Sequence, residues 1–235
     1  MNLNALHLGV LFFAVSFSAY SAEIYHKDGN KIDLSGQINV ARSISHDEGS
    51  NGDSYPYARF GFKGETKINN ELTGYGAWQY QYSLKNSEGS DSQSGNRTRL
   101  GYAGFKYQTF GSIDYGRNYG VLYDVLAYTD MLAYFGGESA YSDGFLSSRS
   151  SGVLTWRNND FFGLVDGLSF AAQYQGKNDR ASNSDAVRRS NGDGFALSTE
   201  YAFASHIAIS AAYASINRTH TQNLASLGNG KKAQH

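Results

Sequence analysis

The side chains that most often carry catalysis or bind metals are sparse and scattered in this sequence. Its six histidines, at positions 7, 26, 46, 206, 220 and 235, include no pair at the spacing of a metal site. It contains no cysteine, so neither a thiolate metal site nor a disulfide framework can form. Serine is abundant, but no Gly-x-Ser-x-Gly motif with an accompanying histidine and acid is present. We therefore predict that the protein is not an enzyme and that it uses no cofactor.

A second chemical pattern consists of arginines on the polar side of alternating segments. Arg59, Arg99 and Arg149 each occupy the polar parity of a predicted strand, so all three can point toward the same aqueous interior. An arginine on the water-filled inner wall of a barrel is often merely solvated and has no further role. Three cations opposite an anion would instead create a transverse field across a pore, which orients dipolar solutes and sets ion preference.

The elements that must position these arginines alternate between apolar and polar residues. In 31–40 the even positions are Ile, Leu, Gly, Ile and Val, and the odd positions are Lys, Asp, Ser, Gln and Asn. The pattern recurs along the chain. It predicts nine strands, at about 31–42, 56–68, 71–84, 97–108, 111–118, 149–157, 167–177, 193–203 and 206–217.

The connections between these strands distinguish a membrane barrel from a soluble sandwich. Short turns at 69–70, 110–112, 163–167 and 204–205 alternate with long polar stretches near 43–56, 85–96, 118–148 and 178–192. Short turns alternating with long external loops are typical of outer-membrane barrels, as is the clustering of Tyr and Phe toward strand ends. We predict an all-β, antiparallel transmembrane β-barrel. An odd strand count and a polar tail from Thr219 to His235 predict that the barrel stops before a closing strand.

The N-terminus predicts export. An apolar run from Leu8 to Phe17 is too short to span a bilayer as a helix, and small residues at 19 and 21 suit cleavage after Ser21. We therefore divide the chain into a signal peptide, 1–21, and a barrel portion, 22–235. The formal net charge of −1 supplies no basic field, so we expect no nucleic-acid partner.

Several separated motifs resemble the enterobacterial general porins of the OmpF/OmpC type. They occur in the same order as in that family and cover 22 to about 232. They are Ala22-Glu23-Ile24-Tyr25, Gly61-Phe62-Lys63-Gly64-Glu65-Thr66, Leu72-Thr73-Gly74-Tyr75-Gly76, Asp114-Tyr115-Gly116-Arg117-Asn118-Tyr119-Gly120, Phe162-Gly163-Leu164-Val165-Asp166-Gly167-Leu168 and Arg188-Arg189-Ser190-Asn191-Gly192-Asp193-Gly194.

The resemblance implies an outer-membrane homotrimer of roughly 16-stranded barrels. Each barrel would be a water-filled diffusion pore for small hydrophilic solutes and ions, in contact with outer-membrane lipid and lipopolysaccharide. It also implies that the third external loop folds inward as a constriction. The stretch 118–148 fits that role from its own residues, because it is the longest loop and much of it is apolar. A compact surface loop is the alternative.

The same resemblance assigns roles to individual residues of the predicted constriction. Arg59, Arg99 and Arg149 match wall arginines of the family, Arg188 and Arg189 match further basic wall positions, and Asp130 matches an acidic loop position. Two positions depart from the family: Tyr134 stands where Glu is usual, and Gln37 stands where a lumenal Lys occurs. We hypothesise a constriction with less negative charge and a bulkier loop tip, hence a weaker cation preference and a slightly tighter pore.

Trimer contacts are implied in the second external loop. Glu88 and Asp91 match residues that latch onto a neighbouring subunit, with Arg117 as a partner across the interface. As exposed charges they could also contribute nothing measurable.

Three other functions are alternatives to a passive pore. A barrel enzyme would need clustered catalytic residues, and a small filled barrel would lack a long inward apolar loop. The third alternative is an interrupted gene product, a porin remnant without channel activity, because the chain ends Lys231-Lys232-Ala233-Gln234-His235 rather than in a strand with a terminal aromatic residue.

Overall fold

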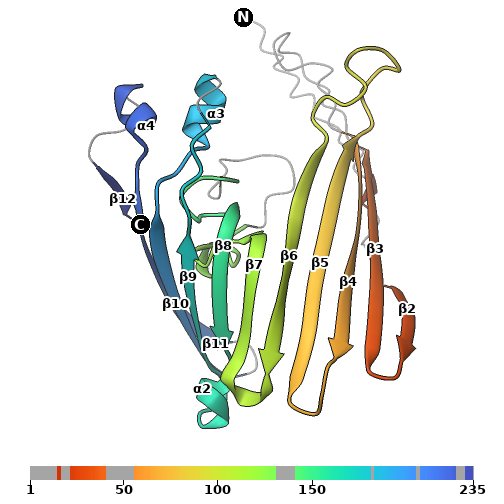
Figure 1. Cartoon of the computed structure of the whole chain (residues 1–235), viewed down its shortest axis with the longest axis vertical. Coiled ribbons are helices and arrows are strands. Elements are labelled where there is room, and N and C mark those ends of the chain that lie inside the picture. The colour runs from red at the N-terminus through yellow and green to blue at the C-terminus, as the bar shows by residue number, and fades with distance from the viewer. Residues whose placement is uncertain are drawn as a thin grey trace, which may run out of the picture.

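The computed structural model describes residues 15–16, 22–40, 56–130, 141–180, 183–204, 207–225 and 231–234. They form one antiparallel sheet of twelve strands in which each strand from β3 to β12 pairs with the next along the chain, while β1 and β2 both pair with β3 (Figure 1). The strands are β1 (Val15–Ser16), β2 (Ala22–Lys27), β3 (Asn30–Val40), β4 (Tyr57–Lys67), β5 (Leu72–Ser83), β6 (Arg97–Tyr107), β7 (Gly111–Tyr119), β8 (Arg149–Asn158), β9 (Leu168–Gln175), β10 (Gly194–Ala204), β11 (Ile207–Asn217) and β12 (Lys232–Gln234).

All nine predicted strands are present as β3 to β11, and the all-β antiparallel fold class is confirmed. The tail also holds a short strand that was not predicted, β12, which pairs with the end of β11 through Ala233 and Ile216 but not with β3. Three residues carry too little alternation to be recognised as a strand from sequence. Among the described strands, neither β11 nor β12 pairs with β3, so the sheet is an open wall.

Most of the predicted signal peptide, 1–21, lies outside the described residues. Within it, β1 pairs with the far end of β3, Val15 opposite Val40. No helix among the described residues is long and apolar enough to cross a membrane. The helical elements are short: η1 (Gln108–Phe110), α1 (Tyr123–Leu126), α2 (Asp160–Gly163), α3 (Ser184–Arg188) and α4 (His220–Leu224).

The two faces of the sheet differ in chemistry along every long strand. On one face large apolar side chains are exposed, among them Leu34, Phe62, Tyr115, Leu197 and Ile209. The opposite face carries polar side chains, many of them buried or half-buried, including Gln81, Arg99, Asp114 and Gln173. Strands of 8–12 residues with this alternation match the length and pattern of membrane-spanning strands. We call the two surfaces the apolar face and the polar face.

Aromatic rings gather where the short turns join the apolar face. Phe162 lies 6.1 Å from the ring centre of Trp156 and 6.2 Å from that of Phe110. The turn holding Phe161 and Phe162 places both in the left-handed region of backbone space, which is strained for aromatic residues. Asn158 stabilises the turn by accepting a hydrogen bond from the backbone N–H of Phe162 at 2.7 Å. This arrangement is typical of the aromatic girdle of membrane barrels.

Candidate functional site

The polar face carries a row of alternating amide and guanidinium groups across β3, β4 and β5. Strand register places Gln37 opposite Arg59, and Arg59 opposite Gln81. Arg59 Nε donates to Gln81 Oε1 at 2.7 Å, and one terminal nitrogen of Arg59 donates to Gln37 Oε1 at 3.3 Å. The structure therefore brings two of the predicted site residues, Gln37 and Arg59, into direct contact.

Arg99 joins this row from a β-bulge in β6. The register between β5 and β6 shifts between Gln79 and Tyr80, which leaves Arg99 without a paired residue across the ladder. Its Nε donates to Gln79 Oε1 at 2.8 Å and a terminal nitrogen reaches Gln81 Oε1 at 3.4 Å. Only 9% of its surface is exposed. Gln81 therefore accepts hydrogen bonds from both Arg59 and Arg99.

Arg149 completes the cationic group from the first position of β8. Its guanidinium lies 5.7 Å from the ring centre of Tyr119 and donates to Ser142 Oγ at 2.6 Å. The guanidinium of Arg59 lies 4.1 Å from the Tyr57 ring. The charges of Arg59, Arg99 and Arg149 repel one another, which shows that the three groups occupy one region of the polar face. We call them the arginine cluster.

Residues 120–130 and 141–148 pack on the polar face as two arms, which we call the inner loop. Its two arms meet closely, since a Cβ on Gly120 would lie 2.0 Å from the Leu146 carbonyl oxygen. Val121, Leu122 and Leu146 are buried in a cluster with side chains of β8 to β11. The apolar residues that set this stretch apart in the sequence thus cover the sheet, at least in the described arms.

Polar contacts fasten the inner loop to three strands. Asp124 forms a two-point ion pair with Arg157 of β8, at 2.8 and 3.0 Å, and accepts a hydrogen bond from Ser198 of β10 at 2.8 Å. Gln173 of β9 accepts from the Val121 N–H at 3.1 Å and donates to the Tyr119 carbonyl at 2.9 Å. A two-point carboxylate–guanidinium pair fixes orientation as well as distance.

The predicted loop acid Asp130 is exposed and contacts a tyrosine rather than an arginine. It accepts a hydrogen bond from the Tyr123 hydroxyl at 2.7 Å. Burial, and then this hydrogen bond, raises the pKa of Tyr123 to about 12. The neighbouring Tyr128 hydroxyl donates to Glu200 on β10, which raises the pKa of Tyr128. Tyr134, predicted at the loop tip, lies outside the described residues.

Arg188 and Arg189 lie at the end of α3 in the long connection between β9 and β10, not on a strand and not in the arginine cluster. Arg189 pairs with Asp185 at 3.0 Å.

The predicted trimer-contact residues lie apart from the arginine cluster. Glu88 and Asp91 are exposed in the loop between β5 and β6. Asp91 accepts hydrogen bonds from the hydroxyl and N–H of Ser87, which lower its pKa. Arg117 forms a two-point ion pair with Asp143 of the inner loop, at 2.7 and 3.0 Å, so its guanidinium has a partner within the chain.

Sequence reasoning missed several residues that hold this site together. Gln79 and Gln81 were detectable, because both have the polar parity of their strand. Asp124, Arg157 and Asp143 had no comparable signal, because each contact joins a loop to a distant strand. Among the described residues, no three His, Asp or Glu side chains gather in a way that could hold a metal ion.

Comparisons with known proteins agree with this geometry. A sequence model of the Gram-negative porin family matches residues 27–235. The chain is 53% identical to outer membrane porin F of Escherichia coli K12 over 239 residues, which is 100% of the chain and 64% of that relative. It is 50% identical to outer membrane protein F of Serratia marcescens, covering 99% of the chain and 62% of that protein.

A solved structure is also similar. A Salmonella typhi OmpF complex with daunomycin superposes with a TM-score of 0.80 at 46% identity, covering 91% of this chain and 62% of that one. The chain therefore spans less than two thirds of the length of these relatives.

Proposed function

Because the chain belongs to the Gram-negative porin family, we propose that the polar face of its sheet lines a water-filled channel for diffusion of small hydrophilic solutes and ions. The family consists of β-barrel proteins of the Gram-negative outer membrane, which are channels and not enzymes. In this proposal the apolar face contacts outer-membrane lipid, including lipopolysaccharide, and the protein needs no nucleic-acid partner.

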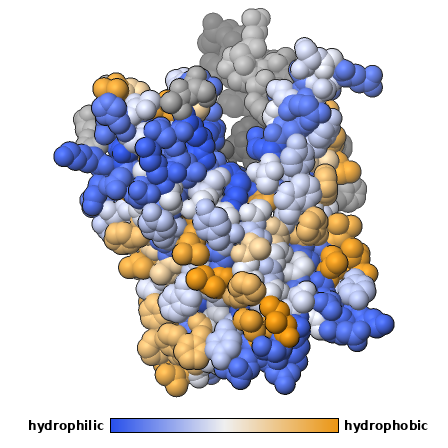
Figure 2. All heavy atoms as spheres, viewed as in Figure 1, coloured by the Kyte–Doolittle hydropathy of each residue, from blue (hydrophilic) through white to orange (hydrophobic). Residues whose placement is uncertain are grey.

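One observation carries the proposal: a continuous apolar face lies directly behind a polar face that bears the arginine cluster. Ile209 and Leu197 expose 68% and 50% of their surface, which is unfavourable in water and favourable against hydrocarbon. Figure 2 shows many hydrophobic residues in the lower half of the view, with hydrophilic residues above them and also at the lower right. A lumen behind such a surface must be wet to solvate the half-buried guanidinium groups of Arg59 and Arg149.

The inner loop narrows this channel in our proposal. The stretch 118–148 acts as the constriction, with Arg59, Arg99 and Arg149 on the wall and Asp130 and Tyr134 on the loop. Arg188 and Arg189 would add positive charge farther along the polar face. Gln37 contributes a neutral amide to the arginine row and accepts a hydrogen bond from Arg59 without cancelling its charge. We expect a weaker cation preference and a slightly tighter pore than in the relatives.

The assembly we propose is a homotrimer, with Glu88 and Asp91 contacting a neighbouring subunit. Their exposure on one loop supports this assignment. Arg117 would have to share its guanidinium between Asp143 and that neighbour. Electrophoresis of unheated and boiled outer-membrane fractions tests the assembly, because a detergent-resistant trimer migrates slowly until it is boiled. Identical mobility of the two samples would contradict a stable trimer.

Liposome swelling tests the channel itself. Purified chain in lipid vesicles should admit neutral sugars at rates that fall with their size. Vesicles that hold the inserted chain and yet exclude the smallest sugar would contradict the proposal. That result would favour the alternative, a porin fragment without channel activity.

A further inference from the structure

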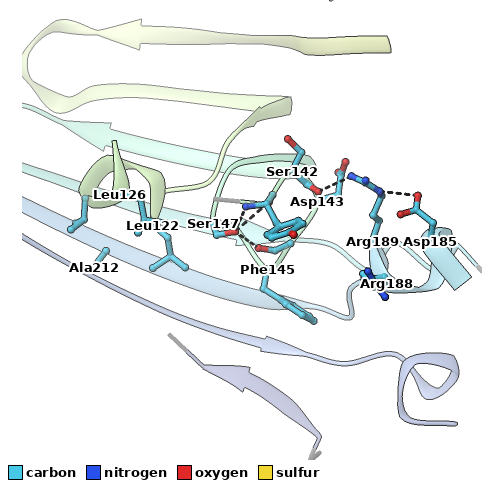
Figure 3. A pocket seen from close by; sticks show the side chains of 13 residues that line it. Leu122, Leu126, Ser142, Asp143, Phe145, Ser147, Asp185, Arg188, Arg189 and Ala212 are labelled. Carbon is cyan, nitrogen blue, oxygen red and sulfur yellow. Dashed lines mark hydrogen bonds and ion pairs between the residues drawn. The ribbon is translucent and has the colours of Figure 1, made fainter. Parts of the chain in front are cut away.

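A cavity of about 740 Å³ lies between the inner loop, α3 and β11. Figure 3 shows its lining side chains, with α1 at one end and α3 at the other. Its volume falls in the range of pockets that hold small organic molecules. Ala212, which lines it from β11, has the parity opposite to the exposed Ile209 and Tyr213, so the cavity opens on the polar face.

One end of the cavity is apolar. Leu122 and Leu126 approach from α1, Phe145 from the returning arm of the inner loop, and Ala212 from β11. Leu122 is buried, and Phe145 packs against the same hydrophobic cluster. These side chains offer a flat ring and branched aliphatic groups to a planar apolar body.

The other end is charged, and its carboxylates already have partners. Asp185 is paired with Arg189 at 3.0 Å. Asp143 is paired with Arg117 at 2.7 Å and approached by Arg180 at 3.7 Å. Arg188 also lines the cavity, and among the described residues no hydrogen bond or ion pair involves it. One guanidinium therefore remains available at this end.

We propose that the cavity binds small solutes that combine a planar apolar body with one anionic group, such as aryl carboxylates and aryl sulfonates. This inference rests on the proposed function, since the solute reaches the cavity from the lumen. The apolar body lies against Leu122, Leu126 and Phe145, and the anionic group accepts hydrogen bonds from Arg188. A guanidinium binds a carboxylate or sulfonate through paired, charge-assisted hydrogen bonds.

The charge at this end selects against other solutes of the same shape. A cation would meet the free charge of Arg188, which repels it. A neutral ring would fill the apolar end but would make no charge-assisted contact with Arg188. The apolar end and the charged end of the cavity together therefore favour an anionic aromatic solute over a cationic or neutral solute of the same shape.

Calorimetric titration of the purified full chain in detergent with naphthalene-2-sulfonate tests the proposal. Arg188→Gln should weaken binding about tenfold, the value of a lost charge-assisted hydrogen bond. Lys177→Gln is the matched control, because it removes one positive charge from the same long connection outside the cavity lining. We expect it to bind the sulfonate as the unaltered chain does.

Naphthalen-2-ylmethylammonium supplies the second arm, with the same ring and the opposite charge. It should bind weakly to the unaltered chain and more tightly to Arg188→Gln. Equal sulfonate affinity in the unaltered chain and Arg188→Gln, or equal affinity for both ligands, would overturn the proposal. If the vesicles swell but the chain does not bind the sulfonate, the proposed binding cavity is contradicted and the proposed channel is not. If the chain binds the sulfonate but the vesicles do not swell, the proposed channel is contradicted and the proposed binding cavity is not.

Discussion

The guanidinium of Arg59 donates a hydrogen bond at 2.7 Å to the side-chain carbonyl of Gln81, which also accepts from Arg99. A neutral amide therefore holds two cations in place without cancelling either charge. The charged groups that act most strongly on Arg59 and Arg99 include Arg97 and Arg149, which add to the positive charge of this wall. This relationship keeps the wall of the proposed channel positively charged.

Gln81→Glu should strengthen the preference of the channel for cations. A carboxylate at this position would accept the same hydrogen bonds and neutralise part of the arginine cluster, so the lumen would attract cations more strongly. Reversal potentials across a salt gradient should shift toward the cation equilibrium value. Gln93→Glu, on the exposed loop between β5 and β6, adds the same charge away from the wall and should shift it far less. Equal shifts would show that the cluster does not set selectivity.

Asp124→Asn should loosen the inner loop. The substitution removes the two-point ion pair with Arg157, whose partners are each about one-third exposed. We expect a loss of about 1–2 kcal/mol in the free energy of unfolding, at the upper end for a partly exposed pair. Urea unfolding in lipid vesicles measures this quantity. Asp166→Asn, in a short exposed turn, is the control and should leave the urea midpoint of unfolding unchanged. A similar loss of stability in both variants would contradict a stabilising role of the Asp124–Arg157 ion pair.

Tyr123 gives the inner loop a pH-dependent contribution to stability. Burial and the hydrogen bond to Asp130 raise its pKa from an ordinary value near 10 to about 12. Because the folded-state pKa is raised, the contribution is complete below about pH 10 and is lost as the pH rises toward 12. Asp130→Asn should lower the pKa of Tyr123 without restoring the ordinary value, since burial remains.

Ultraviolet difference titration of tyrosinate follows this change, and Tyr123→Phe identifies the signal of Tyr123 among the 18 tyrosines. An unchanged titration in Asp130→Asn would contradict the role of the hydrogen bond.

Leu197→Arg should impair membrane insertion. Leu197 lies near the middle of β10 on the apolar face with 50% of its surface exposed. An arginine facing lipid costs about 2–4 kcal/mol at the bilayer midplane. Ser210→Arg on β11 is the matched control, because Ser210 has polar-face parity and lies opposite Glu200 in the register. The yield of protease-resistant, vesicle-inserted chain should fall for the first variant only. Equal yields would contradict the assignment of the two faces.

The strands could be predicted from the sequence because their signal is local. Each of β3 to β11 carries its own period-2 alternation, and the parity of Arg59, Arg99 and Arg149 followed from it. β12 was not predicted, because three residues hold no pattern that distinguishes them from a loop.

The anchors of the inner loop could not be predicted for a different reason. The pairing of Asp124 with Arg157 joins residues 33 apart, and its geometry depends on where an irregular loop meets a strand. The β-bulge that leaves Arg99 without a paired residue on β5 likewise depends on how β5 and β6 pair, and not on the sequence of β6 alone. The positions of Arg188 and Arg189 on α3 follow from a short helix capped by Asn183, whose side chain accepts from the Ala186 N–H at 2.8 Å.

Single-channel recording in a planar lipid bilayer tests the central claim most directly. The purified chain, added at low concentration in detergent, should produce discrete steps of ionic current whose reversal potential shifts with Gln81→Glu. A bilayer that contains the inserted chain and carries no steps, across the whole range of applied voltage, would contradict a water-filled channel along the polar face.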